Sequence, residues 1–212
     1  MNDALRSIFF RVVVRPVVYL FLGVNVRHSE RLPRRGPAII VANHNSHLDT
    51  IVLMCLFPMR MLRLLRPVAA ADYFLRRRLL AWFSLEIMGI IPIDRRVRAS
   101  HDPLETSVEA LDRGEILILF PEGSRGEPEV LNEFKAGVAH LVKRRPAVPV
   151  IPVYLHGLGK SLPRGEALLV PFICDAFVGE PLTWQGNKEQ FMHELNDRMT
   201  ALAAEGAFPA WE

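Results

Sequence analysis

Short apolar segments alternate with longer amphipathic segments along most of the 212-residue chain. The short segments are rich in Val, Ile and Leu and are bounded by Gly, Pro or polar residues, which is typical of buried strands. They cover residues 37–42, 61–71, 88–93, 115–120, 148–153 and 167–178. The segments between them have the periodicity of helices. This alternation predicts one α/β domain of three layers, with a central mixed, mostly parallel sheet and helices on both faces.

Local signals indicate where two of these helices begin. Ser46 and Asp49 form a capping-box pattern, which places the first helical residue at about His47. Asn187 and Gln190 form a similar pair at the start of a closing helix that runs to about residue 205. The strand before His47 and the helix after it are therefore joined by a tight turn.

Residues 1–26 show an amphipathic pattern of their own. Arg6, Arg11 and Arg15 lie off an apolar stripe, which consists of positions 5, 8, 9, 12, 13, 17 and 20. The longest uncharged run has eleven residues, 16–26, whereas a membrane-spanning helix needs about 20. We expect an N-terminal membrane-association segment that lies in the interface, followed by the main domain at 27–212. Packing of this helix on the domain core is the alternative.

A second basic and apolar segment lies further along the chain. Three arginines, 76–78, precede four bulky apolar side chains: Leu79, Leu80, Trp82 and Phe83. This combination suggests a surface that faces a membrane or an acyl-carrier protein, with a solvated basic face as the alternative.

Charge is distributed unevenly. Residues 1–98 carry 16 Arg and 6 acidic residues, a net charge of +10, and residues 99–212 carry −7, which together make the +3 of the whole chain. A basic front half favours an anionic partner such as a membrane surface or a phosphorylated substrate. The sequence has no nucleic-acid-binding signature, so we expect no nucleic-acid partner. The only cysteines, Cys55 and Cys174, lie in apolar surroundings and indicate a reducing compartment.

His44 and Asp49 are the clearest candidates for chemistry. His44 falls in the turn at the carboxyl end of a strand, where open α/β sheets bind their ligands. From the first helical turn, the Asp49 carboxylate can reach one imidazole nitrogen and leave the other as a proton acceptor. Two alternatives stay open: Asp49 only caps the helix, or His44, His47 and Asp49 bind a metal ion.

A second strand-end loop, 121–126, contains Glu122, Gly123 and Arg125. Lys135 stands at the start of the helix that follows. An anion could bind between that helix N-terminus and the Arg125 guanidinium.

Four motifs stand in order at 43–49, 89–95, 120–125 and 148–152. Together they resemble the glycerolipid acyltransferase family, which includes lysophosphatidate and glycerol-3-phosphate acyltransferases. The resemblance implies that His44 is the general base, that Asp49 orients it, and that no covalent acyl-enzyme forms. It also implies a set of residues that bind the acceptor phosphate: Gly89, Asp94, Arg95, Glu122, Gly123 and Arg125. We add Lys135 to this set because of its position at a helix start.

The resemblance implies transfer of an acyl group from acyl-CoA or acyl-carrier protein to a lysolipid hydroxyl, in phospholipid biosynthesis. Lysophosphatidate is the default acceptor, with another lysophospholipid or a lyso-ornithine lipid as alternatives. No metal and no cofactor beyond the acyl-thioester co-substrate are expected. The sequence departs from the commoner family pattern at Pro92 and at 124–126. We expect a monotopic protein on the cytoplasmic face of a membrane. Two alternatives from other functional classes are a metal-dependent hydrolase and a catalytically silent membrane-surface protein with the same fold.

Overall fold

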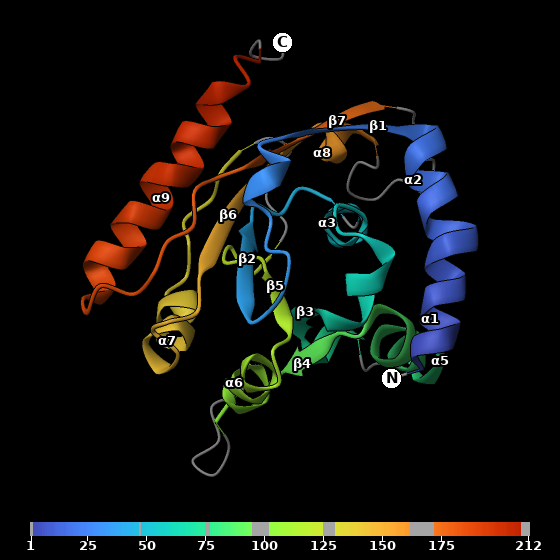
Figure 1. Ribbon diagram of the computed structural model, residues 1–212, viewed down its shortest axis with the longest axis horizontal. Helices are drawn as coiled ribbons and strands as arrows, with labels where there is room; N and C mark the ends of the chain where they lie inside the picture. The colour runs from blue at the N-terminus through green and yellow to red at the C-terminus, as the bar shows by residue number, and fades with distance from the viewer. Residues whose placement is uncertain are drawn as a thin grey trace.

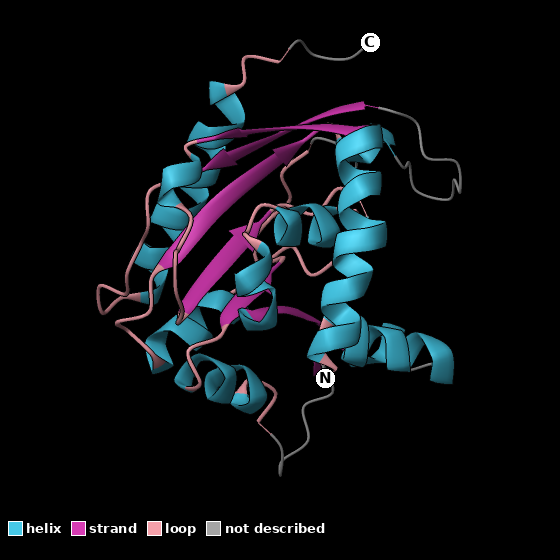
Figure 2. Cartoon of the chain, turned by 45° about the vertical axis from the view of Figure 1, so that its right-hand side comes forward, coloured by secondary structure: helices cyan, strands magenta, loops and turns pink. Residues whose placement is uncertain are grey.

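The structure is a computed structural model, and it describes residues 2–46, 48–74, 77–94, 102–124, 130–161 and 172–208. Within these ranges the chain forms a central sheet with helices on both sides (Figure 1, Figure 2). The prediction of a three-layer α/β domain is therefore confirmed.

The sheet has seven strands in the order β1-β7-β6-β2-β5-β3-β4. All neighbouring pairs are parallel except β6 and β7, which are antiparallel. The sheet is thus mixed and mostly parallel, as predicted. The strands are β1 (Leu22–Arg27), β2 (Ala38–Ala42), β3 (Leu65–Ala70), β4 (Ile91–Ile93), β5 (Ile116–Leu119), β6 (Val150–His156) and β7 (Phe172–Val178).

Helices cover the two faces of this sheet in separate sets. One face is packed by α1 (Asp3–Phe9), the π-helical turn η1 (Phe10–Val14), α2 (Arg15–Phe21), α3 (Asp49–Cys55), the 3₁₀ turn η3 (Met59–Leu64) and α8 (Leu158–Ser161). The other is packed by α6 (Glu105–Asp112), α7 (Gly137–Arg144) and α9 (Lys188–Glu205). Four short elements complete the description: η2 (Ser29–Arg31), α4 (Ala71–Phe74), α5 (Arg78–Trp82) and the π-helical turn η4 (Phe83–Met88).

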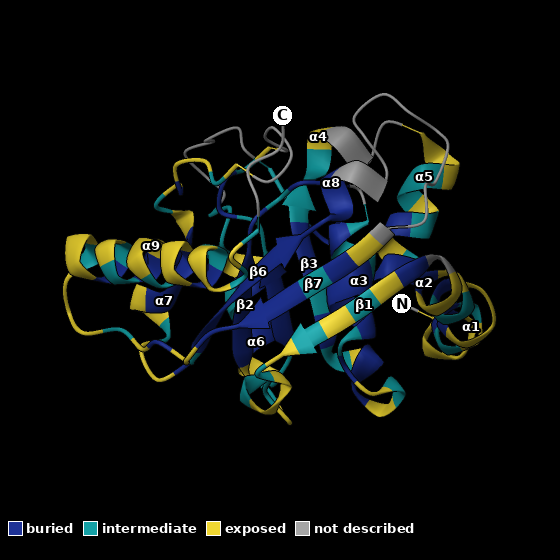
Figure 3. Cartoon of the chain, turned by 90° about the horizontal axis from the view of Figure 1, so that it is seen from above, coloured by how far each residue is buried: buried dark blue, intermediate teal, exposed yellow. Residues whose placement is uncertain are grey.

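Strand β2 lies in the middle of the sheet, and its burial explains its uninterrupted apolar sequence. All five residues are completely buried. Ile39 and Val41 face the α7 and α9 side, while Ile40 and Ala42 face the α3 side. A strand covered on both faces needs apolar residues at every position. Figure 3 shows this contrast, with the central strands buried and the edge strand β1 partly exposed.

Several predicted boundaries need correction. Helix α3 begins at Asp49, two residues later than predicted, because Leu48 still belongs to the preceding turn. The predicted strand 61–71 begins with the 3₁₀ turn η3 and becomes a strand only at Leu65. Its first residues are buried apolar residues of a short helix, which periodicity alone cannot separate from a buried strand. The predicted cap of the closing helix is confirmed, since Asn187 accepts the Gln190 N–H at 3.0 Å. Pro92 lies in the edge strand β4, where a residue without an N–H is tolerated.

The N-terminal helices are part of the domain. Phe10, Val14 and Val18 are buried against the core, and Leu22 begins β1, which pairs with β7. The boundary expected between residues 26 and 27 falls inside β1 and is corrected accordingly. The predicted apolar stripe is largely on the outer face, however, since Leu5, Ile8, Val12, Val13, Val17 and Leu20 are exposed. In the described residues no helix combines the length and the apolar content that crossing a bilayer requires.

Arg6 is the most deeply buried charged residue of this helix. Its guanidinium donates to the backbone carbonyls of Leu65 at 2.9 Å and Met88 at 3.0 Å. Burial lowers its pKa to about 10. The expectation that Arg6 lies at the edge of a membrane-facing stripe is wrong, because its hydrogen bonds hold it inside the domain. Of the three N-terminal arginines, Arg11 is the exposed one, while Arg15 donates to the Phe57 carbonyl at 2.5 Å.

Candidate active site

His44 and Asp49 meet as predicted. His44 lies in the turn after β2, and its Nδ1 is 2.9 Å from Oδ2 of Asp49. The opposite ring nitrogen, Nε2, is therefore the one left to accept a proton from a substrate. The imidazole stacks on the ring of Phe120 with centroids 4.3 Å apart, which fixes its plane. His44 thus has an orienting carboxylate on one side and an aromatic platform on one face.

Asp49 is completely buried and serves as an acceptor for three groups. Besides His44, its Oδ2 accepts the backbone N–H groups of Asn45 at 2.6 Å and Ser46 at 2.8 Å. The bond to Ser46 is the reciprocal half of the predicted capping box, and Ser46 Oγ accepts the Leu48 N–H at 3.3 Å. Burial raises the pKa of Asp49, and the hydrogen bonds from His44, Ser46 and Asn45 oppose that shift. The carboxylate therefore holds the turn before α3 and orients the imidazole, while α3 itself, with Leu48 as its N-cap residue, has no side-chain cap.

Glu122 connects the second predicted loop to His44. Its side chain is buried, Oε1 accepts the His44 backbone N–H at 3.0 Å, and Oε2 accepts from Asn132 Nδ2 at 2.9 Å. Burial raises the pKa of Glu122, and the hydrogen bond from Asn132 opposes this. Each oxygen of Glu122 thus accepts a hydrogen bond from within the protein, and contact of Glu122 with the acceptor stays a prediction. Glu122 holds the His44 turn in place.

Gly123 and Lys135 lie together beside this loop. Gly123 has a φ of +74°, and a Cβ placed on it would come within 2.7 Å of Lys135 Nζ. The Lys135 side chain therefore lies directly over Gly123, and its backbone N–H donates to the Pro121 carbonyl at 2.9 Å. Lys135 is exposed, which leaves its ammonium accessible to an anion. The structure thus brings Lys135, Gly123 and Glu122 to one loop next to the His44 turn.

The other predicted phosphate-binding residues are less close or are not described. Gly89 is buried with a φ of +69° and ends η4, so its visible role is to turn the chain. Asp94 follows β4, which stands three strand spacings, or about 14 Å, from β2 in the sheet order. Arg95 and Arg125 lie outside the described residues, as does His47.

Two asparagines that the sequence analysis did not single out fasten the His44 turn to β6. Asn43 Nδ2 donates to the Leu155 carbonyl at 2.9 Å, and its Oδ1 accepts the Leu155 N–H at 2.7 Å. Asn45 Nδ2 donates to the same carbonyl at 3.1 Å. The available signal was a pair of amides flanking His44 at the end of a buried strand, where a polar side chain needs a partner.

A metal site finds no support in the part of the chain that the structure describes. Among those residues, which exclude His47, no three His, Cys, Asp or Glu side chains are grouped closely enough to hold a metal ion.

Comparison with known proteins decides the family. The family model described as Acyltransferase matches residues 23–156, a range that contains His44, Asp49, Glu122 and Lys135. The chain belongs to the acyltransferase family. The resemblance recognised from the four motifs is thus confirmed, and the match extends from β1 to the end of β6.

Individual relatives of the chain fit the same family assignment. The chain is 32% identical over 151 residues to 1-acyl-sn-glycerol-3-phosphate acyltransferase LPAT1, chloroplastic, of Arabidopsis thaliana, covering 70% of this chain and 40% of the plant protein. It is 26% identical over 196 residues to 1-acyl-sn-glycerol-3-phosphate acyltransferase alpha of Bos taurus, covering 89% and 64% of the two chains. The chain thus spans less than two thirds of the length of these curated relatives.

A solved structure supports the fold. The crystal structure of the 1-acyl-sn-glycerophosphate (LPA) acyltransferase PlsC from Thermotoga maritima matches with a TM-score of 0.73 and 22% identity. The match covers 96% of this chain and 79% of the Thermotoga chain. At this coverage the match extends well beyond residues 23–156, the range of the family match.

Proposed function

We propose that the protein transfers a fatty acyl group from an acyl thioester to the hydroxyl of a lysolipid, with 1-acyl-sn-glycerol-3-phosphate as the acceptor and phosphatidic acid as the product. The observation that carries the proposal is the His44–Asp49 hydrogen bond of 2.9 Å at the carboxyl end of β2. A base held by a buried carboxylate is what activation of a hydroxyl requires.

The reaction needs one proton acceptor and no metal. Nε2 of His44 takes the proton of the acceptor hydroxyl while the oxygen attacks the thioester carbonyl carbon. The carbon–sulfur bond then breaks, and the departing thiolate takes the proton from the imidazolium. Asp49 stabilises the imidazolium at Nδ1 in the interval, and Phe120 keeps the ring in one plane. General-base catalysis of this kind contributes about 10² to 10⁴-fold.

The acceptor phosphate is proposed to bind at the loop after β5. Lys135 lies exposed over Gly123 there, and Glu122 links the same loop to the His44 turn. Arg125 and Arg95, which we also expect to contact the phosphate, have the guanidinium fork that matches its geometry. The names of the plant and bovine relatives support lysophosphatidate as the acceptor. Another lysophospholipid or a lyso-ornithine lipid remains the competing acceptor.

Acyl-CoA and acyl-carrier protein are both proposed as donors, since both are acidic and residues 1–98 carry a net charge of +10. The donor is the only co-substrate in this proposal, and phospholipid biosynthesis is the pathway it serves.

Because a lysolipid resides in a bilayer, we propose that the protein is monotopic on the cytoplasmic face of a membrane. The outer face of α1 to α2 supports this, since it exposes Ile8, Val12 and Leu20 to solvent. Both cysteines are free and buried, which fits a reducing compartment. Deleting this segment is an unsuitable test because Phe10, Val14 and Val18 belong to the core. Substitution of Ile8, Val12 and Leu20 by Ser leaves that core intact and should weaken flotation with vesicles.

The proposal is tested by offering acyl-CoA or acyl-carrier protein with a panel of lysolipids to the purified protein and analysing the products by mass spectrometry. We expect phosphatidic acid from lysophosphatidate and none with the His44→Ala variant. If a diacyl product formed only from a different lysolipid, that lysolipid would replace lysophosphatidate as the proposed acceptor. Equal product from wild type and His44→Ala would refute the proposed chemistry.

A further inference from the structure

The helix formed by α5 and η4 carries bulky apolar side chains on its outer face, which is exposed to solvent. Its inner side, with Ser84, Ile87 and Met88, is buried in the domain. Its outer side exposes Leu79, Trp82 and Leu85, and Leu79 is 84% exposed. Of the twelve large hydrophobic side chains that are exposed in the described ranges, ten lie on this helix or on the helix from α1 to α2.

The two helices are joined into one unit. The rings of Phe9 on α1 and Phe83 on η4 meet edge to face with centroids 5.5 Å apart. The guanidinium of Arg6 on α1 donates to the Met88 carbonyl at the end of η4. Figure 1 shows α5 beside the N-terminal end of α1. A membrane that contacts the exposed apolar face of α1 to α2 therefore also lies next to the exposed apolar face of α5 and η4.

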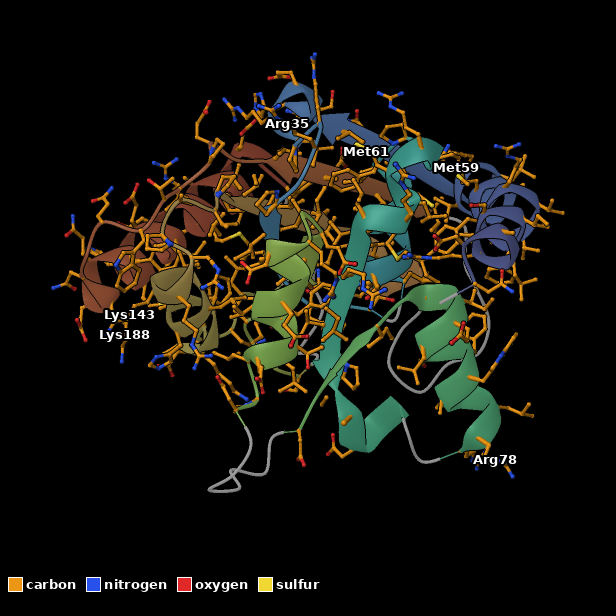
Figure 4. The ribbon with its side chains drawn as sticks, turned by 60° about the horizontal axis from the view of Figure 1, so that its bottom comes forward. Arg35, Met59, Met61, Arg78, Lys143 and Lys188 are labelled. Atoms are coloured by element: carbon orange, nitrogen blue, oxygen red, sulfur yellow. The ribbon has the colours of Figure 1, made fainter. Side chains whose placement is uncertain are left out.

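Arg77 and Arg78 add positive charge to this apolar face. They line an open hollow of about 580 Å³ together with Leu79, Leu80 and Phe83. Both arginines are exposed, and Arg78 stands on the opposite side of the molecule from Lys143 and Lys188 (Figure 4). Guanidinium groups above an apolar wall complement a lipid, whose phosphate lies directly above its acyl chains.

We propose that the helix formed by α5 and η4 is a second membrane-inserting element, and that the hollow beside Arg77 and Arg78 binds the phosphate of an anionic lipid in the bilayer. This inference rests on the proposed function, which places the protein on a membrane. A carrier protein is the less suitable occupant, since its departure after each turnover would return Leu79 and Trp82 to water. A bilayer covers them continuously.

The position of α5 gives this contact a consequence for catalysis. The chain reaches α5 through α4 from the carboxyl end of β3, and His44 follows the carboxyl end of β2. Because the two strands are parallel to β5, which lies between them, both ends are at the same edge of the sheet. Insertion of α5 thus holds the edge that carries His44 against the bilayer, where the acceptor hydroxyl is.

Tryptophan fluorescence tests the insertion. The chain has three tryptophans, and Trp184→Phe with Trp211→Phe leaves Trp82 as the sole reporter. With vesicles of phosphatidylcholine and phosphatidylglycerol, we expect the Trp82 emission to shift to shorter wavelength and to be quenched by lipids brominated on the acyl chain. Co-sedimentation in the same samples shows whether the protein is bound. Unchanged Trp82 emission from vesicle-bound protein would refute insertion of α5 while leaving the proposed membrane association intact.

Charge substitutions test the hollow. The Arg77→Gln/Arg78→Gln variant should bind phosphatidylglycerol-containing vesicles about 25-fold more weakly, at about fivefold for each arginine near an anionic leaflet. Its binding to pure phosphatidylcholine vesicles should change little. The matched control, Lys143→Gln/Lys188→Gln, removes the same charge from the far side and should bind as wild type. If the arginine variant bound both vesicles normally but had a raised KM for acyl-carrier protein, the hollow would be a carrier-docking site and the lipid proposal would be wrong.

Discussion

The carboxylate of Glu122 accepts the backbone N–H of His44 at 3.0 Å, although 78 positions separate the two residues in the chain. The bond ties the loop after β5 to the turn after β2, and these are neighbouring strands of the sheet. The other oxygen of Glu122 is held by Asn132. The proposed general base therefore depends on three segments of the chain, and a change in one of them should alter the position of the imidazole.

Glu122→Gln should lower both activity and stability. The glutamine oxygen can still accept the His44 N–H, but its NH₂ group then faces Asn132, whose exposed amide must turn to present its oxygen. The substitution thus replaces hydrogen bonds to a charged group, which contribute about 1.5–3 kcal/mol each, by neutral ones, which contribute about 1 kcal/mol. Adding Asn132→Asp supplies an acceptor for the glutamine NH₂, so the double variant should regain part of the free energy of unfolding. Urea unfolding and kcat measure this, and a double variant no better than Glu122→Gln would contradict the role of Asn132.

The difference in stability between wild type and Glu122→Gln should depend on pH. Burial raises the pKa of Glu122 above its ordinary value of 4.5, so the folded state binds a proton more readily than the unfolded state. Wild-type stability should therefore fall, relative to Glu122→Gln, as pH rises from 4.5 through the raised pKa. The difference in free energy of unfolding between the two proteins is then larger near pH 5 than at pH 7. A difference that grows toward pH 7 would show that the folded-state pKa is lowered instead.

His44→Ala should lose about 10² to 10⁴-fold in kcat while keeping the fold, because only the proton acceptor is removed. Asp49→Asn should also lose activity and should lower the free energy of unfolding by about 1 kcal/mol, because the hydrogen bonds from the Asn45 and Ser46 N–H groups lose their charged acceptor. Circular dichroism and thermal unfolding serve as the control for structure. A His44→Ala protein with wild-type turnover would show that another group is the base.

Asn43→Ala should impair both stability and catalysis. It removes the two hydrogen bonds to Leu155 and leaves the Leu155 N–H without its partner, at a cost of about 1–3 kcal/mol. Asn187→Ala is a suitable control, since it removes a single exposed cap at the start of α9 and should cost about 1 kcal/mol without changing kcat. If the two variants reduced kcat equally, the link from Asn43 to the His44 turn would have no catalytic importance.

Arg6 and Arg11 should respond differently to substitution. Arg6→Met leaves the Leu65 and Met88 carbonyls without their donor, so it should lower the free energy of unfolding by about 1–3 kcal/mol with little change in vesicle binding. Arg11→Gln should leave stability unchanged and weaken binding to anionic vesicles by about fivefold. The reverse pattern would place Arg6, and not Arg11, at the membrane.

Lys135→Gln should raise the KM for lysophosphatidate more than the KM for the acyl donor. An ammonium that binds the phosphate equally in the ground state and the transition state affects KM and leaves kcat unchanged. Lys143→Gln, which changes an exposed lysine on α7, is the control. If the KM for lysophosphatidate were unchanged in Lys135→Gln, Lys135 would not bind the phosphate, and Arg95 and Arg125 would be the remaining candidates.

The sequence by itself determined the features that depend on residues close together in the chain. The pairing of His44 with Asp49 follows from a separation of five residues across a strand-to-helix turn. The Asn187 cap follows from a separation of three. The alternation of strands and helices follows from local periodicity, because a side chain's direction relative to its near neighbours is set by the backbone repeat.

The tertiary structure decided which of two apolar faces of the N-terminal helix is buried. Positions 10, 14 and 18 and positions 5, 8 and 12 both recur at helical spacing, and only the packing against the sheet shows that the first set is inside. It also gave Glu122 a structural role as a support for His44, since that contact exists only because β5 pairs with β2. The order of strands in the sheet brings distant segments of the chain together, and this order cannot be predicted from the spacing of residues along the sequence.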